Sequence, residues 1–177
     1  MTSSQIQFNP TALLEQPDFS VAAKLAAEID ELISHYPQKR SASLMVLHAI
    51  QDQVGWISRQ AAEWTAAKLD LQPINVLELV TFYPMFRRQP LGKYQIKVCR
   101  TLSCALGGAH HLHEHFCKKL GLDSEAHGPQ TTKDGKYTVE FVECLASGGT
   151  APVMMCNDTF YEAVTEPRAD EILGGCK

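Results

Sequence analysis

The sequence predicts an α+β protein in which an N-terminal helical bundle precedes a compact βαββα module. Apolar residues recur at helical spacing through residues 20–90. Beyond residue 91 the period changes to the two-residue alternation of a half-buried strand, followed by one helix, two further strands and a last helix. We therefore divide the chain into a flexible arm at 1–19, a helical domain at 20–90 and a second domain at 91–177.

Four amphipathic helices are expected in the helical domain, because apolar residues line one face of each and capping residues or prolines bound them. The arm before them lacks periodicity, and residues 87–92 are expected to form a linker. The expected helices run from the N-cap Ser20 to Pro37, from about Ser41 to Gly55, from Ser58 to Leu69, and from a capping box of Asn75 and Glu78 to Pro84.

The second domain alternates between strand and helix signals. Tyr94, Ile96 and Val98 lie on one face of a strand that ends at Cys99. A helix follows Gly107 and Gly108, with leucine and phenylalanine every four residues. The other expected elements are the end of that helix at Gly121, a hairpin turn at Asp134-Gly135 with a strand ending near Cys144, a strand from Pro152 to Cys156, and a helix after Thr165.

Composition and charge exclude several classes of function. The chain has 16 Lys+Arg against 20 Asp+Glu, a net charge of −4, so it lacks the basic patch of a nucleic-acid-binding protein. No apolar stretch approaches the roughly 20 residues of a membrane span. The start shows no secretory signal, which makes the cytoplasm the expected compartment. No phosphate-binding glycine loop is present, so a nucleotide site is not expected.

Three cysteines follow strands and form the main candidate site. Cys99 and Cys104 form a C-x4-C pattern at the end of one strand, and Cys144 follows a later strand. Neighbouring strand ends would bring the three thiols to one edge of a sheet. Thiolates are the ligands that iron–sulfur clusters use. The spacing alone also suits buried structural cysteines.

A set of short motifs extends from about residue 36 to the end of the chain: 36–42 (YPQKRSA), 53–57 (QVGWI), 80–83 (VTFY), Cys99, Cys104, 143–145 (ECL), 150–152 (TAP) and 157–158 (ND). In these residues the chain resembles the small thioredoxin-like 2Fe-2S component, known as the E subunit, of NADH:quinone oxidoreductase (complex I) and its counterparts in NAD-linked hydrogenases and formate dehydrogenases. The resemblance implies that residues 91–177 form a thioredoxin-like 2Fe-2S ferredoxin module.

The resemblance implies an electron-transfer subunit of an NADH-oxidising complex, with no bond chemistry of its own. Cys99 and Cys104 would hold one iron of a 2Fe-2S cluster, and Cys144 would bind the other. The resemblance also implies a neighbouring subunit that carries FMN and the NADH site, together with further iron–sulfur subunits. Such a protein would belong to the peripheral arm of a membrane-associated complex, or to a soluble complex, in the cytoplasm.

One position departs from the family pattern. The resemblance implies a fourth cysteine that follows Cys144 in the pattern C-x3-C, but that position is Gly148, which has no thiolate. The second iron would need a substitute, and Ser147, Cys156 and Cys176 are the candidates. We expect Cys156 to be buried and inert, and Cys176 to be an exposed thiol in a mobile tail.

The remaining cysteine, Cys117, and the histidines of the same region are expected to have structural roles. Cys117 lies beside Phe116 on a helix and is expected to pack as a small hydrophobic residue. Four histidines between residues 110 and 115 spread around the same helix, and only His111 and His115 share a face. A solvated histidine face is therefore expected there in place of a zinc site.

Two other functions compete with electron transfer. Because Gly148 removes a ligand, the chain could be a structural subunit that docks on the flavoprotein without holding a stable cluster. Thiol–disulfide exchange would require C-x-x-C in place of C-x4-C. Iron content separates the first alternative from the electron carrier.

Overall fold

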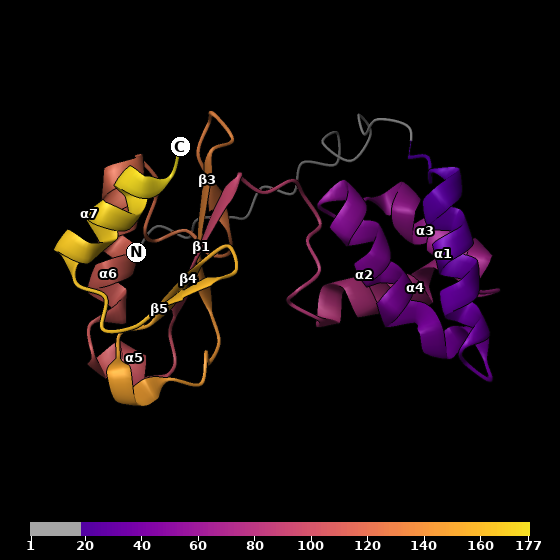
Figure 1. Ribbon diagram of the computed structural model, residues 1–177, viewed down its shortest axis with the longest axis horizontal. Coiled ribbons are helices and arrows are strands. Elements are labelled where there is room, and N and C mark those ends of the chain that lie inside the picture. Colours follow the sequence, from indigo (N-terminus) through magenta and orange to yellow (C-terminus); the bar gives the residue numbers. More distant parts are fainter. Residues whose placement is uncertain (1–18) are drawn as a thin grey trace, which may run out of the picture. The chain divides into compact units, whose positions relative to one another are not determined.

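The computed structural model describes residues 19–177 (Figure 1). The predicted arm at 1–19 lies outside these residues, apart from Phe19. The backbone N–H of Phe19 donates to the Gln60 side chain at 2.9 Å, and its ring packs edge-on against Trp64. The chain forms two compact units, of which one ends at Pro90 and the other begins at Leu91. In the described part of the chain, no helix is long and apolar enough to cross a membrane.

The first unit is a helical bundle around its own apolar core. Ile29, Leu47, Ile50 and Val76 are completely buried in it. The elements are α1 (Ala23–Ser34), the 3-10 turn η2 (Lys39–Ala42), α2 (Ser43–Val54), α3 (Arg59–Lys68) and α4 (Pro73–Phe82).

Two of the predicted helix ends are confirmed. The Ser58 hydroxyl accepts a hydrogen bond from the Ala61 N–H at 3.0 Å and so caps α3. Gly55 ends α2 in the left-handed region at φ 89°, a conformation that costs a glycine little.

Two predicted helix starts are wrong. Ser20 does not cap α1, which begins at Ala23 after the extended residue Ala22. The capping box of Asn75 and Glu78 does not exist, because α4 begins two residues earlier at Pro73. Proline is favoured in the first turn of a helix, since its missing N–H has no partner there in any case.

The second unit contains a five-stranded mixed sheet of order β2-β3-β1-β4-β5. The predicted α+β fold class is confirmed, although the short elements α5, β2 and β5 were not predicted. The elements are β1 (Tyr94–Cys99), α5 (Leu102–Leu106), α6 (Ala109–Leu120), β2 (Gln130–Thr131), β3 (Tyr137–Val142), η3 (Gly148–Thr150), β4 (Met154–Cys156), β5 (Thr159–Tyr161) and α7 (Glu166–Gly175).

The central strand β1 sets the layout of this sheet. It pairs in parallel with β3, with Cys99 opposite Val142, and antiparallel with β4, with Ile96 opposite Cys156. The parallel pair brings the ends of β1 and β3 to the same edge of the sheet. Figure 1 shows α6 and α7 together on one face of the sheet and α5 at one end of the unit.

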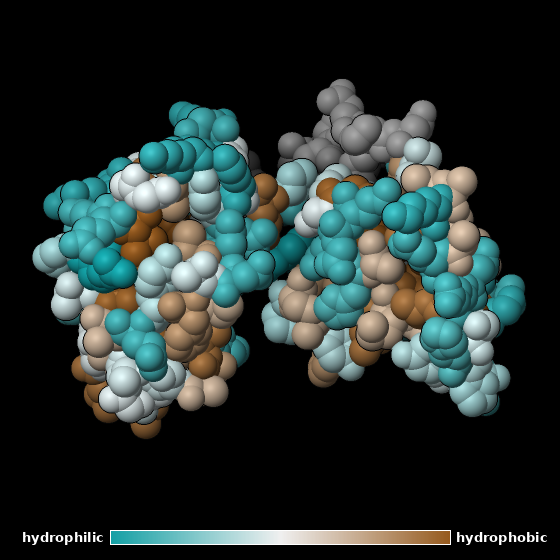
Figure 2. Space-filling view, viewed as in Figure 1, coloured by the Kyte–Doolittle hydropathy of each residue, from teal (hydrophilic) through white to brown (hydrophobic). Residues whose placement is uncertain are grey.

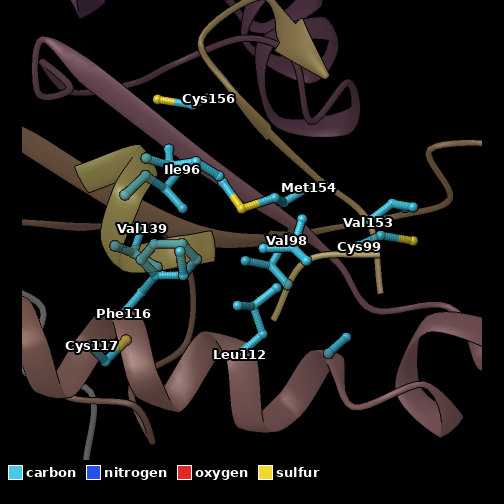
Figure 3. Packing of buried hydrophobic residues seen from close by; sticks show 14 of the residues in the cluster. Ile96, Val98, Cys99, Leu112, Phe116, Cys117, Val139, Val153, Met154 and Cys156 are labelled. Carbon is cyan, nitrogen blue, oxygen red and sulfur yellow. The ribbon is translucent and has the colours of Figure 1, made fainter. Parts of the chain in front are cut away.

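A dense apolar core fixes the strands and α6 against each other. Val98 and Val139 come from the paired strands, Phe116 comes from α6, and Met154 comes from β4; all four are completely buried (Figure 3). Interiors of this density tolerate little change in backbone position. The core therefore holds the ends of β1 and β3 in a fixed relation.

Substitution of Gly92 by alanine should destabilise the second unit. A Cβ on Gly92 would lie 2.6 Å from the carbonyl carbon of Tyr137, which is backbone and cannot rotate away. The backbone N–H of Gly92 also donates to the Thr138 hydroxyl at 2.6 Å. We expect Gly92→Ala to lower the free energy of unfolding by about 1–3 kcal/mol in denaturant titrations, the range for overpacking.

Gly174→Ala is the matched control, because a Cβ at this helical position in α7 meets nothing within 4 Å. It should leave stability unchanged or raise it by about 0.5–1 kcal/mol. Equal effects of the two substitutions would contradict the close approach of Gly92 to β3.

Candidate metal centre

Three cysteine thiols come from the paired edge of β1 and β3. Cys99 is the last residue of β1, Cys104 lies in α5, and Cys144 stands two residues beyond the end of β3. The Arg100 N–H continues the pairing by donating to the Val142 carbonyl at 3.0 Å. The Arg100 guanidinium also bonds Glu143 at 2.5 Å and 3.0 Å, which joins the segment after Cys99 to the segment before Cys144.

Cys99 is buried, yet its thiolate is stabilised. Burial acts to raise the pKa of the Cys99 thiol. The Thr101 hydroxyl opposes this from 3.3 Å, and so do hydrogen bonds from the Leu145 and Thr101 backbone and from the Cys104 side chain. The net result is a Cys99 pKa below its ordinary value.

The pKa of the neighbouring thiol, Cys104, is raised and not lowered. Burial raises its pKa, the Val153 backbone lowers it through a hydrogen bond, and the nearby Cys99 and Cys144 raise it further. The pKa values of these two neighbouring thiols move in opposite directions, so Cys99 ionises more readily than Cys104. Positive charge placed between the three sulfurs would offset the repulsion among their thiolates.

Cys144 is exposed and sits in a tight loop. Its sulfur accepts a hydrogen bond from the Ala146 N–H at 3.3 Å. Ala146 has φ 61°, in the left-handed region that an alanine rarely adopts and that costs about 1–2 kcal/mol. A strained residue of this kind persists where the surroundings fix it, which is common beside functional sites.

Gly148 begins the 3-10 turn η3, so no side chain lies at the fourth position. An ideal Cβ on Gly148 would lie 3.0 Å from both the Cβ and the Oγ of Ser103 in α5. Ser147, one of the substitutes predicted from the sequence, is occupied: its hydroxyl bonds Glu162 and lies 2.8 Å from the Thr150 hydroxyl. Ser103 was not predicted, because no spacing pattern joins α5 to η3.

Cys156 and Cys176, the two cysteines predicted as possible substitutes for the fourth ligand, lie elsewhere in the second unit. Cys156 is opposite Ile96, three residues or roughly 10 Å along β1 from Cys99. It is buried, as predicted. The prediction of an exposed, mobile Cys176 is wrong: α7 extends to Gly175, and Cys176 packs in the core, where its thiol donates to the Ile172 carbonyl at 3.3 Å. The Cys176 thiol also raises the pKa of Cys156, so these two free thiols lie together and away from Cys99.

The histidines of α6 are not a uniformly solvated face, which corrects the prediction. His113 is buried and stacks on Phe141 with ring centroids 3.9 Å apart. Burial lowers the pKa of His113, which keeps the ring neutral. His115 bonds Asp170 of α7 at 2.8 Å, whereas His111 is exposed. Cys117, on the same helix, is completely buried, as predicted.

The donor set fits part of a 2Fe-2S cluster. Such a cluster needs four protein ligands, two on each iron. Cys99 and Cys104 would supply one pair. Cys144 would supply one ligand of the other pair, and Gly148 would supply none. Within residues 19–177 no group of three or more His, Cys, Asp or Glu side chains is arranged to hold a single metal ion. A cluster with its ligands divided between two irons does not require such a group.

An exposed apolar surface adjoins the thiols. Leu102 and Leu106, which flank Cys104 on α5, are 75% and 82% exposed. Figure 2 shows hydrophobic side chains at the end of the second unit where Figure 1 places α5. Exposed leucines grouped beside a candidate site are typical of a contact surface for another protein.

The fold, with three thiols at one edge of its sheet, agrees with that of a class of small iron–sulfur proteins. The thioredoxin-like 2Fe-2S ferredoxin family matches residues 29–177, and the chain belongs to this family. It is 37% identical over 153 residues to NADH-quinone oxidoreductase subunit 2 of Thermus thermophilus, covering 84% of this chain and 82% of the relative. It is 37% identical over 147 residues to the NADH-quinone oxidoreductase E subunit of Rickettsia prowazekii, covering 81% of each. The resemblance seen in the sequence is confirmed.

Solved structures support the same fold. An NAD+-reducing NiFe-hydrogenase in its H2-reduced state aligns with 76% of this chain at a TM-score of 0.64 and 22% identity. The air-oxidised state of that enzyme aligns equally well. This chain spans 22% of the hydrogenase chain, so the likeness concerns the fold of one part.

The six thiols of the metal-free protein should differ widely in their reaction with iodoacetamide at neutral pH. Cys144 is exposed and should be labelled first. Burial raises the pKa values of Cys117 and Cys156 to about 11, so only about one thiol in ten thousand is ionised at either position. Peptide mass spectrometry over time should find these two labelled last. Equal rates at Cys144 and Cys156 would contradict the described burial.

Proposed function

We propose that this chain is the electron-transfer subunit of an NADH-oxidising complex and carries a 2Fe-2S cluster at Cys99, Cys104 and Cys144. The observation that carries the proposal is the meeting of these three thiols at the paired ends of β1 and β3. The names of the relatives agree with it. When bound, the cluster supplies transfer of single electrons.

The chain's own residues have three tasks in this proposal. The Leu145, Thr101 and Ala146 backbones bond the sulfurs and stabilise their negative charge. Burial of Cys99 and Cys104 keeps water from one side of the site. Cys144 is exposed, which leaves the Cys144 side of the site open to a neighbouring redox centre.

The proposed neighbour is the subunit that binds NADH and carries FMN, with further iron–sulfur subunits beyond it. The sequence has no dinucleotide-binding fingerprint, so hydride chemistry belongs to a partner. The exposed Leu102 and Leu106 offer that partner an apolar surface next to Cys104. We place the complex in the cytoplasm, as a soluble enzyme or as the peripheral arm of a membrane-associated one.

A docking subunit without a stable cluster is the alternative function, and Gly148 favours it. The same apolar surface and helical unit would serve assembly alone. The same fold fits both functions, so iron content is the property that distinguishes them.

Iron and acid-labile sulfide of the anaerobically purified protein test the proposal. We expect about two irons and two sulfides per chain and an EPR signal after reduction, because three thiolates hold the cluster. Cys144→Ala should lose the signal, since it leaves the second iron without a thiolate. Cys156→Ala is the control and should keep the signal, because Cys156 ends β4 opposite Ile96, three residues along β1 from Cys99.

A second variant separates the two functions. If the unmodified protein binds no iron while Gly148→Cys binds about two, the chain is a docking subunit and the electron-transfer proposal fails. The Gly148 backbone has no left-handed φ, and the exposed Ser103 side chain can shift to admit the cysteine.

A further inference from the structure

The space next to Gly148 already contains a potential ligand atom. A side chain on Gly148 would begin 3.0 Å from the Ser103 hydroxyl oxygen, which comes from a different segment of the chain. The two residues meet because α5 packs against η3 at the edge where Cys99 and Cys104 lie. The donor nearest to the missing side chain is therefore an oxygen on the α5 side of the site.

The position of Ser103 is fixed although its side chain is exposed. Its carbonyl accepts a hydrogen bond from the Gly107 N–H at 2.9 Å, and the Ala105 N–H bonds Thr101 at 3.0 Å. A Cβ on Gly107 would lie 2.7 Å from the Cβ of Ala151, so the end of α5 sits closely against the segment that follows η3. The backbone therefore holds Ser103 beside Gly148, and rotation about one bond moves its oxygen.

The Ser103 hydroxyl is also available, unlike that of Ser147. Among residues 19–177, no side chain or backbone group forms a hydrogen bond with the Ser103 hydroxyl. The Ser147 hydroxyl, by contrast, is held by Glu162 and Thr150. A ligand from Ser147 would have to break both contacts, whereas Ser103 would break none within the described chain.

We propose that the Ser103 oxygen is the fourth protein ligand of the 2Fe-2S cluster and binds the iron that Cys144 holds. On binding, the oxygen–iron bond forms and the hydroxyl proton leaves to solvent, with no change in the oxidation state of the iron. The inference rests on the proposed function. One iron then has two thiolates, and the other has one thiolate and one oxygen, a harder donor. The two irons are chemically different as a consequence.

Four proteins test this assignment: the unmodified chain, Ser103→Ala, Ser103→Cys and the control Ser147→Ala. The measurements are the EPR line shape after reduction and the rate of iron release to a chelator. Ser103→Ala should release iron about tenfold faster or more, because loss even of an outer partner weakens metal sites by that factor. Ser103→Cys should keep two irons and change the line shape, since a sulfur replaces the oxygen. Ser147→Ala should match the unmodified chain.

The possible failures are distinct. If the unmodified chain holds two irons and Ser103→Ala has the same line shape and the same release rate, Ser103 is not a ligand, and electron transfer stands with a ligand from solvent. If Ser147→Ala alone loses iron, Ser147 is the ligand and the inference is overturned. If the unmodified chain holds no iron under any condition, both the inference and the proposed function fail.

Discussion

The parallel pairing of β1 with β3 is the constraint on which the candidate site depends. It places Cys99 opposite Val142, so the segment that follows β3 must bring Cys144 to the edge where β1 ends. A shift of one residue in this register would turn every side chain of β3 to the other face of the sheet. Val98, Val139 and Phe116 prevent the shift, because they fill one close-packed core between the two strands and α6.

The electrostatics of the edge follow from this placement. Cys99 is buried, which alone would favour the neutral thiol, but backbone and hydroxyl donors from both loops reach its sulfur. Cys104 lies beside it without the same support, and its pKa rises. Both thiols are buried, so the hydrogen bonds from the loops, which Cys99 receives in greater number, separate the two pKa values. Gly148 lies beside the same edge without a side chain, and a Cβ there would lie 3.0 Å from the Ser103 oxygen.

Much of the fold was predictable because it depends on local patterns. The alternation around Ile96 identifies β1, and Ser58 and Gly55 bound their helices by well-known capping chemistry. The failures arise where tertiary contacts decide. Cys176 looked like part of a glycine-rich tail, yet α7 continues through both glycines and buries it. His113 looked solvated within a polar tract, but α6 turns it against Phe141.

The three thiols of the candidate site could be predicted from the sequence, but the Ser103 hydroxyl beside Gly148 could not. The spacing of Cys99 and Cys104 and the strand before Cys144 are visible in the sequence, and the family pattern identifies Gly148 as the departure. The proximity of Ser103 to Gly148 is not visible, because it arises from the packing of α5 on η3, two short elements without a periodic signal.

A 2Fe-2S cluster held by three thiolates and one oxygen has a distinctive Mössbauer spectrum, which protein reconstituted with iron-57 would give. We expect two iron sites in equal amounts with different isomer shifts and quadrupole splittings, because only one of them has an oxygen ligand from the protein. Mononuclear iron, or two sites that cannot be distinguished, would show that no such cluster is held here.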